Sequence, residues 1–308
     1  MKRLFILGLL IVCLVFPFGA SAIAYSNIIA FGDSLTDNGV FGSFNGVTVN
    51  NDPLDGFGFQ YYTNGPVWVE YLADPFHLNV PLFNMAFGGA TTDYDNPAAG
   101  LTPPNPAITG LQWQVDTYTG SSPVPGDALV TVWAGANDFF QGRPFDMAAH
   151  NVTLAVQKLA DAGGDHFLIP FLPDIGLSPG FLGTPLEGPA TGWSQAFNAF
   201  LAADLAVLAS MPGYDDNDYY ILDTFTLLSQ LIADPACYGF TDVTTSGMQT
   251  PPDGYLFWDE VHPTTAAHSW LAYYSMEAIG QPIPEPATIL LLCLGLVGLT
   301  RVRRRFQK

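Results

Sequence analysis

Short apolar runs alternate with stretches of helical periodicity through the middle of this chain. Five mostly apolar runs, each of a length that suits a buried strand, lie at 27–31, 78–84, 128–134, 166–171 and 219–224. Helical spacing of apolar residues occupies 147–162 and 193–210, and a last helix is expected from Pro263 to about residue 279, with the proline in its first turn. The alternation predicts an α/β fold: a flavodoxin-like, doubly wound parallel sheet of five strands flanked by helices.

The first residues do not follow this pattern. Met1-Lys2-Arg3 precede an unbroken apolar run over 4–16, and small residues follow at 20–24. A basic start, a short apolar run and small residues after it are typical of a secretory signal peptide. We therefore expect cleavage after Ala22 or Ala24 and assign residues 1–24 to this signal.

The end of the chain is also set apart. Pro284-Glu285-Pro286 is followed by an apolar segment at 287–300 and by a basic end at 301–308. This tail, 282–308, resembles the PEP-CTERM sorting signal of Gram-negative bacteria, which implies a transient hold in the membrane and processing by an exosortase-like enzyme. A plain C-terminal membrane anchor is the alternative. Basic residues after an apolar stretch stay on the cytoplasmic side, so both interpretations place the folded part outside the cytoplasm, in the periplasm, at the cell surface or beyond it.

Between these ends, residues 25–281 suffice for one α/β domain with a single core. Arg143 and Lys158 are the only Lys and Arg of this segment, whereas nearly all of the 28 Asp and Glu residues lie in it. Such an acidic surface repels polyanions, which excludes nucleic acid as a partner and favours neutral lipids or glycans. The charge can equally serve only to keep an exported protein soluble.

Candidates for a metal site or a disulfide are few. Cys13 and Cys293 fall in the end segments, which leaves Cys237, expected to be buried, as the one thiol between them. A disulfide within 25–281 and a zinc site are therefore not expected. The acidic cluster 215–218 could bind calcium, but no glycine and glutamate complete an EF-hand loop, so a solvated turn is favoured. No metal and no organic cofactor is expected.

The candidate chemistry begins at the end of the first predicted strand. Ser34 follows Gly32-Asp33 there, with a helix expected to open after it, and this placement lets a nucleophile face a cleft. Asp259 and His262 lie three positions apart near the other end of the domain. Taken singly, Asp259 could cap a helix and His262 could be an ordinary helix-start residue. Taken together, a serine, a histidine and a carboxylate are the parts of a Ser-His-Asp site.

The same edge of the predicted sheet collects donors for an oxyanion. Loops that follow parallel strands meet at one edge, so Gly88-Gly89 and Asn137 are expected beside Ser34. A glycine amide, the side-chain amide of Asn137 and the Ser34 N–H could stabilise the oxyanion formed when a serine attacks an ester. Asn137 could instead cap a turn. The Pro/Gly-rich stretches 96–110 and 178–192 are expected to be loops over this cleft.

These segments together resemble the GDSL lipases and esterases of the SGNH hydrolase superfamily. The matching blocks lie at 32–39, 84–90, 135–138 and 259–263. The resemblance implies the SGNH hydrolase fold and a role for each matching residue. The implied catalytic residues are Ser34 as nucleophile, His262 as base and Asp259 as its orienting carboxylate, and the implied oxyanion donors are Ser34, Gly89 and Asn137.

Two choices within these blocks need a reason. Gly89 is preferred to Gly88 because the family's glycine directly precedes a small residue, here Ala90. Asp33 and Asp37 also match the first block, but we interpret them as hydrogen-bonding residues of the turn.

Other polar and aromatic residues have weaker claims. We interpret four histidines as structural or surface residues: His77, His150, His166 and His268. Several aromatic residues could line an acyl or sugar cleft, although core packing is the default explanation for most of them. They are Tyr61, Tyr62, Phe87, Trp133 and Phe139.

The leading hypothesis is an exported serine hydrolase, a lipase or esterase that cleaves carboxylic esters of lipids or small molecules through an acyl-enzyme on Ser34. An acetyl esterase acting on an acylated extracellular polysaccharide is an alternative, motivated by the sorting tail. A surface or matrix protein that uses the fold only for binding is a third, which the acidic charge fits. Adhesion, however, has no need of a complete set of catalytic residues.

Overall fold

The computed structural model describes residues 23–39, 62–97, 108–248 and 253–281. The expected signal peptide, the C-terminal tail and Tyr61 lie outside these ranges.

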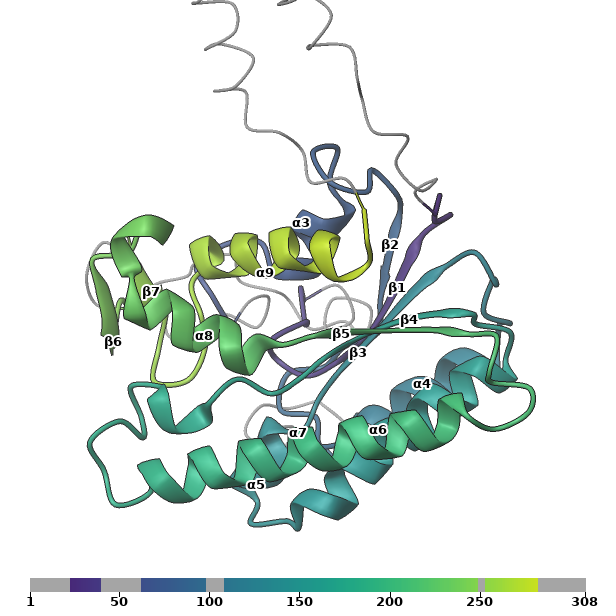
Figure 1. Cartoon of the computed structure of the whole chain (residues 1–308), viewed down its shortest axis with the longest axis horizontal. Helices are drawn as coiled ribbons and strands as arrows, with labels where there is room; N and C mark the ends of the chain where they lie inside the picture. The colour runs from purple at the N-terminus through teal and green to yellow at the C-terminus, as the bar shows by residue number, and fades with distance from the viewer. Residues whose placement is uncertain (1–22, 40–61, 98–107, 249–252, 282–308) are drawn as a thin grey trace, which may run out of the picture.

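Five parallel strands form the central sheet in the order β2-β1-β3-β4-β5 (Figure 1). They are β1 (Ile28–Gly32), β2 (Leu82–Asn84), β3 (Leu129–Trp133), β4 (His166–Pro170) and β5 (Asp218–Leu222). Every residue of β1 and β3 is buried, whereas the edge strands β2 and β5 are largely half-exposed. Central strands covered on both faces explain the continuous apolar runs, and the predicted α/β fold with a five-stranded parallel sheet is confirmed.

Helices cover both faces of this sheet (Figure 1). One layer contains α3 (Trp68–Ala73), α8 (Thr224–Ala233) and α9 (Thr265–Ala278). The other contains α4 (Leu111–Thr119), α5 (Ala136–Phe140), α6 (Phe145–Asp161) and α7 (Glu187–Ala209). Outside the two layers lie the short helices η3 (Ile175–Leu177) and η4 (Pro235–Tyr238) and a parallel pair of strands, β6 (Asp242–Ser246) and β7 (Tyr255–Phe257).

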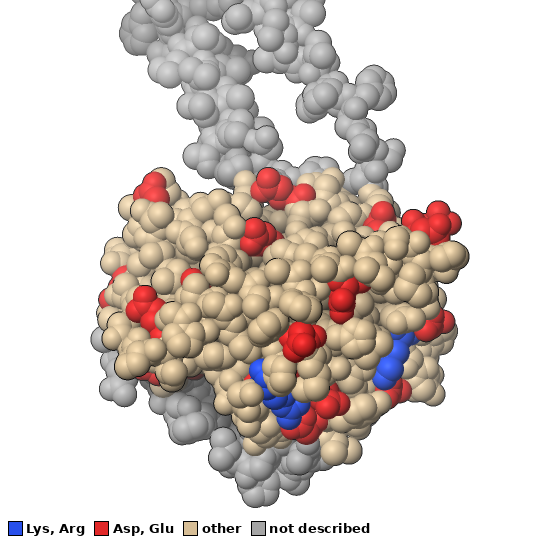
Figure 2. Space-filling view, turned by 60° about the horizontal axis from the view of Figure 1, so that its bottom comes forward, with Lys and Arg blue, Asp and Glu red and all other residues tan. Residues whose placement is uncertain are grey.

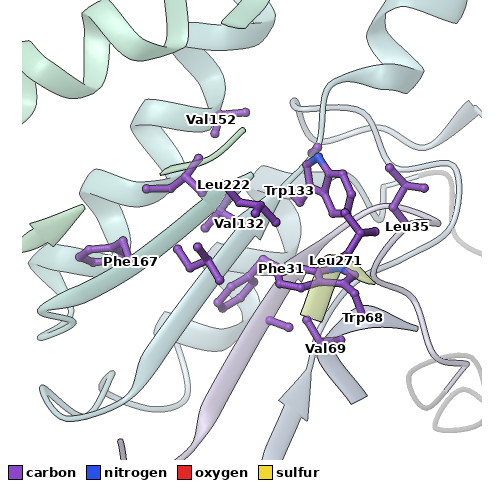
Figure 3. Packing of buried hydrophobic residues seen from close by; sticks show 14 of the residues in the cluster. Phe31, Leu35, Trp68, Val69, Val132, Trp133, Val152, Phe167, Leu222 and Leu271 are labelled. Atoms are coloured by element: carbon purple, nitrogen blue, oxygen red, sulfur yellow. The ribbon is translucent and has the colours of Figure 1, made fainter. Parts of the chain in front are cut away.

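The hydrophobic core fills the space between the sheet and the helices (Figure 3). Trp68 of α3 and Trp133 of β3 pack edge to face, with ring centroids 5.6 Å apart. Phe31 and Phe167, from β1 and β4, are fully buried. Burying one such side chain contributes about 1.5–3 kcal/mol, so the strands are held mainly by the helices packed on them.

Two predicted boundaries shift for reasons of backbone chemistry. Strand β2 begins at Leu82 and not at residue 78, because Asn79 adopts a positive φ of 53° and Pro81 has no N–H to give to a ladder. Helix α7 begins at Glu187, inside the predicted loop 178–192. Pro189 falls in its first turn, where an N–H has no partner within the helix, so the proline costs nothing there.

The last helix also starts later than predicted. Pro263 lies before it, and Thr264 is its N-cap, with the threonine side chain accepting a hydrogen bond from the amide of Ala267. Four helices and two strands were not predicted from the sequence, and all of them are short: α3, α4, α5, α8, β6 and β7.

The two ends of the described domain meet where the strands begin. The side-chain amide of Gln281 donates to the backbone oxygen of Ile23 at 2.6 Å. Ile23 lies shortly before β1, so both ends leave the domain at the amino edge of the sheet.

A glutamine side chain continues the sheet where β2 stops. Gly32, the last residue of β1, donates its amide to Oε1 of Gln114 at 2.9 Å and accepts from Nε2 of the same side chain at 2.8 Å. Gln114 is fully buried and thus stands in for a neighbouring strand. This contact fixes the backbone two residues before Ser34.

We expect Gln114→Leu to lower the free energy of unfolding by about 1–3 kcal/mol, because it leaves the buried amide of Gly32 without a partner, whereas the carbonyl of Gly32 keeps the amide of Phe87. Urea denaturation measures the change. Thr117→Ala, on the exposed face of the same helix, is the matched control and should stay within about 0.5 kcal/mol of wild type. Equal stabilities of Gln114→Leu and wild type would show that the glutamine contact is dispensable.

Candidate active site

The strand order creates a crevice at the carboxyl end of the sheet. From β1 the chain goes to β2 on one side and later to β3 on the other, and ligands of doubly wound sheets bind where the order reverses in this way. Ser34 follows β1 and Asn137 follows β3, so both lie at this point.

Ser34, His262 and Asp259 form one hydrogen-bonded chain. Oγ of Ser34 lies 2.8 Å from Nε2 of His262, and Nδ1 of His262 lies 2.6 Å from Oδ2 of Asp259. The structure therefore brings together the three residues that the sequence singled out. In this arrangement the imidazole can take the proton of the serine hydroxyl while the carboxylate fixes the ring orientation.

A closed loop holds the histidine in place. Oδ1 of Asp259 accepts from the amides of Val261 and His262 at 2.8 and 2.7 Å, and the amide of Trp258 donates to the backbone oxygen of His262 at 2.8 Å. Burial alone would raise the pKa of Asp259, but the hydrogen bond and charge of His262, with these amides, keep the pKa below its ordinary value. Asp259 is thus held as a carboxylate.

Up to residue 39, where this described segment ends, the backbone after Ser34 forms a turn and not the helix expected to open there. The amides of Thr36 and Asp37 both donate to the backbone oxygen of Asp33, and Oδ1 of Asp33 accepts from the amide of Leu35 at 3.1 Å. The side chain of Asp33 competes with helical hydrogen bonding, as short polar side chains do in turns. Gly32 is needed before this turn because a Cβ would lie 2.3 Å from the backbone oxygen of Trp133.

The two glycines after β2 differ in their hydrogen bonds. The amide of Gly88 donates to Oδ2 of Asp37 at 2.7 Å. Within the described ranges, the amides of Gly89 and Ser34 donate to no protein oxygen. Of the two, Gly89 therefore has the amide that could meet an oxyanion, and its role as a donor stays a prediction.

Asn137 is fixed by the loop that carries these glycines. Its Nδ2 donates to the backbone oxygen of Ala90 at 3.0 Å and lies 3.4 Å from Oδ2 of Asp33. The second contact is long, so one N–H of the amide is only weakly engaged. Asp138, fully buried, accepts from the amide and hydroxyl of Thr92 at 2.9 Å each and ties α5 to the same loop.

A model of the GDSL-like Lipase/Acylhydrolase family matches residues 28–274. The chain belongs to this family. A second model, the PEP-CTERM protein-sorting motif, matches residues 282–305. The blocks around Ser34, Gly89, Asn137 and His262 all lie within the first match.

Relatives of this GDSL-family chain are distant. It is 27% identical to the thermolabile hemolysin of Vibrio parahaemolyticus, over 82% of this chain and 63% of the relative, and 24% identical to the phosphatidylcholine-sterol acyltransferase of Aeromonas hydrophila, over 88% and 95%. A Pseudomonas putida relative, 30% identical, is covered over 51% of its length, so the chain spans only part of some relatives. A crystal structure of a lipolytic G-D-S-L family protein from Veillonella parvula has a TM-score of 0.47 and 19% identity, covering 82% of this chain and 96% of that one.

Three buried carboxyl groups lie on the loops around Ser34. Burial raises the pKa of Asp33 and of Asp37 to about 7, although the amide of Leu35 opposes this for Asp33 and the amides of Gly39 and Gly88 for Asp37. Burial likewise raises the pKa of Asp138 to about 6 against the opposing hydrogen bonds of Thr92. These carboxyl groups serve the loops as hydrogen-bond acceptors, which agrees with the interpretation of Asp33 and Asp37 from the sequence.

Tyr62, one of the aromatic residues named from the sequence as possible cleft residues, lies beside His262. Its ring centroid lies 5.1 Å from that of His262, and a Cβ on Gly88 would penetrate its ring. No spacing in the sequence relates Tyr62 to His262. Of the other aromatic residues named from the sequence and described here, Trp133 is buried and also lines the pocket beside Ser34, whereas Phe87 and Phe139 belong to the core or pack against it.

A pocket opens beside Ser34, with about 830 Å³ of empty space including its mouth. Ser34, Asn137 and His262 lie in its wall, and so does Ser178, from the stretch predicted to cover the cleft. The other Pro/Gly-rich stretch, 96–110, lies mostly outside the described residues.

The remaining candidates from the sequence lie away from the serine or are structural. Three histidines contact an aspartate through Nδ1: His77 at 2.9 Å, His150 at 3.0 Å and His166 at 2.8 Å. Cys237 is exposed, contrary to expectation, because it follows Pro235 in a short surface helix. Across the described ranges, neither 215–218 nor any other segment gathers three side chains fit to hold a metal ion. No described helix is both long and apolar enough for a membrane crossing.

His268 is structural and fully buried on α9. Its Nδ1 accepts from the amide of Trp68 at 3.2 Å and so satisfies the first N–H of α3. Burial, with a smaller contribution from the charge of His262, lowers the pKa of His268 to about 3.

We expect His268 to make the domain less stable as pH falls below ~6.5, because the unfolded histidine binds a proton that the folded one excludes. His268→Asn keeps an acceptor for Trp68 and removes this titration. Between pH ~4 and ~6, His268 should make the free energy of unfolding of the wild type rise by about 1.4 kcal/mol per pH unit. Urea denaturation of the variant should show a slope that is smaller by this amount. His150→Asn is the control, since its imidazole is 60% exposed. Equal slopes for wild type and His268→Asn would contradict the assignment.

Proposed function

We propose that residues 25–281 form an exported serine hydrolase that cleaves carboxylic esters through an acyl-enzyme on Ser34. The observation that carries this proposal is the continuous contact from Ser34 through His262 to Asp259, at 2.8 and 2.6 Å. Membership of the GDSL-like lipase and acylhydrolase family supports it.

In the first half of the reaction, Ser34 Oγ attacks the ester carbonyl as its proton passes to Nε2 of His262. The resulting oxyanion accepts hydrogen bonds from the amides of Ser34 and Gly89 and from Nδ2 of Asn137, which turns from Asp33. His262 then gives the proton to the leaving alcohol, and the acyl group remains on Ser34.

In the second half, His262 takes a proton from a water molecule, and the hydroxide attacks the acyl-enzyme. Collapse of this intermediate returns the proton to Ser34 Oγ and releases the acid. An alcohol in place of water would give acyl transfer. The acyltransferase and esterases among the relatives are compatible with either acceptor.

We expect Ser34→Ala to lower kcat for a p-nitrophenyl ester by roughly 10³-fold or more while the protein stays folded. Asp259→Asn should lower kcat by roughly 10²–10⁴-fold, because the amide cannot hold the imidazole in the required tautomer. Ser210→Ala, an exposed serine at the end of α7, is the control. Undiminished turnover by Ser34→Ala would refute the proposal, as would labelling of another residue by a phosphonate probe.

Surface export and sorting are suggested by the PEP-CTERM motif at 282–305. We further propose that residues 1–24 are a cleaved signal and that an exosortase-like enzyme processes the tail. The protein recovered from a host with this machinery should start at Ile23 or Tyr25 and lack the basic end, which intact-mass measurement checks. In a host without exosortase the tail should remain, and a tail retained in both hosts would rule out such processing.

A further inference from the structure

The pocket at Ser34 has one polar end and one apolar wall. The catalytic candidates Ser34, Asn137 and His262 occupy the polar end, with Asp33 beside them. Beyond them the wall is apolar and comes from several elements, with aromatic rings from Trp133, Phe140 and Phe257. Its aliphatic members include Leu227, Leu228 and Leu231 of α8, Leu256 of β7, Ala267 and Leu271 of α9, and Ile175 of η3.

The polar side chains farther along the wall are already hydrogen-bonded within the protein. The hydroxyl of Thr224 donates to the backbone oxygen of Phe171 at 2.5 Å, and that of Ser178 donates to Ile175 at 2.7 Å. Oδ1 of Asp174 accepts from an amide at 3.0 Å and from a threonine hydroxyl at 2.6 Å, which leaves its other oxygen as the one acceptor of this group open to a ligand. A sugar in this part of the pocket would lose hydrogen bonds to water and find few replacements, which is costly.

Charge also restricts what the wall can accept. Arg143 and Lys158, the only Lys and Arg of the described ranges, do not line the pocket. Each is paired with an aspartate, Asp95 and Asp116 respectively, at 2.6 Å. Figure 2 shows the blue side chains next to red ones, and further red side chains scattered over the tan face. The wall thus offers no cation for a phosphate or carboxylate group.

We propose that this pocket takes a long aliphatic chain of the ester, packed against the leucine face of α8, and that this face sets the chain-length preference. The inference rests on the proposed function. The leucines are themselves largely buried, so the gain lies in the chain: each methylene of a longer chain leaves water for this apolar wall, whereas an acetyl group has none to place there. Burial of one methylene corresponds to roughly fourfold in binding, so binding energy accumulates along the chain.

The first test uses the wild-type protein with two series of esters. In one, p-nitrophenyl esters run from acetate through butyrate and octanoate to laurate; in the other, acetates of alcohols lengthen in the same steps. We expect kcat/KM to rise at least about tenfold from the shortest to the best chain in one series, which identifies the chain as acyl or alcohol. A flat or falling profile in both series, or preference for acetylated xylan, would overturn the inference.

The second test changes the wall itself. Leu231→Trp fills space along α8 and should reduce the ratio of kcat/KM for octanoate to that for acetate by about tenfold, or the corresponding alcohol-chain ratio if that series showed the preference. Ile232→Trp is the matched control, because Ile232 is the next residue of the same helix and does not line the pocket. An unchanged ratio in Leu231→Trp would overturn the inference. If that variant does not fold, Leu231→Ala should move the optimum toward longer chains, and an unmoved optimum counts against the inference.

The two proposals fail in different ways. Absence of any Ser34-dependent ester hydrolysis would refute the proposed function. Hydrolysis that depends on Ser34 but not on chain length would leave that function intact and refute only the assignment of the pocket.

Discussion

Buried hydrogen bonds between the loops after β1, β2 and β3 are the constraint on which the active site depends. Asp37, after β1, holds the amide of Gly88, after β2, and Asp138, after β3, holds both the amide and the hydroxyl of Thr92. Away from water such bonds are strong, and removing one partner costs about 1–3 kcal/mol for the group left behind. Three segments distant in sequence therefore behave as one rigid rim around Ser34.

The same hydrogen bonds explain how three carboxyl groups can be buried close to one another. Carboxyl groups are rarely buried, yet Asp33, Asp37 and Asp138 are all buried here. Each accepts at least one hydrogen bond from a backbone amide, which compensates in part for the loss of water. The pKa values of these groups are still raised, because the hydrogen bonds offset only part of the cost of removing the charged carboxylates from water.

Much of this fold could be predicted from the sequence because central parallel strands are apolar at nearly every residue. β1 and β3 are such strands, and their positions were predicted to within about one residue. The residues that meet where these strands end, among them Ser34 and Asn137, were also named from the sequence. The turn after Ser34 was predicted as a helix because apolar spacing does not report that the Asp33 side chain takes the amide of Leu35. Chemistry-bearing residues were thus easier to predict than the backbone that carries them.

Contacts between residues far apart in the chain, and the shape of the pocket, could not be predicted from the sequence. Tyr62 lies on His262 from a segment two hundred residues away, and no local pattern relates the two. The leucines of α8 have helical spacing in the sequence, but this spacing is the same whether the leucines pack on a sheet or line a pocket. Such differences arise from how helices pack, which residue order does not specify.

The hydrogen bond between Gln281 and Ile23 has a consequence for orientation. Both ends leave the domain at the amino edge of the sheet, whereas Ser34 lies at the carboxyl edge, on the far side of the strands. A linker at either end would therefore attach to the side of the domain opposite Ser34. A domain immobilised in this way, on a cell envelope or on a resin, would present the crevice at Ser34 outward to the solution.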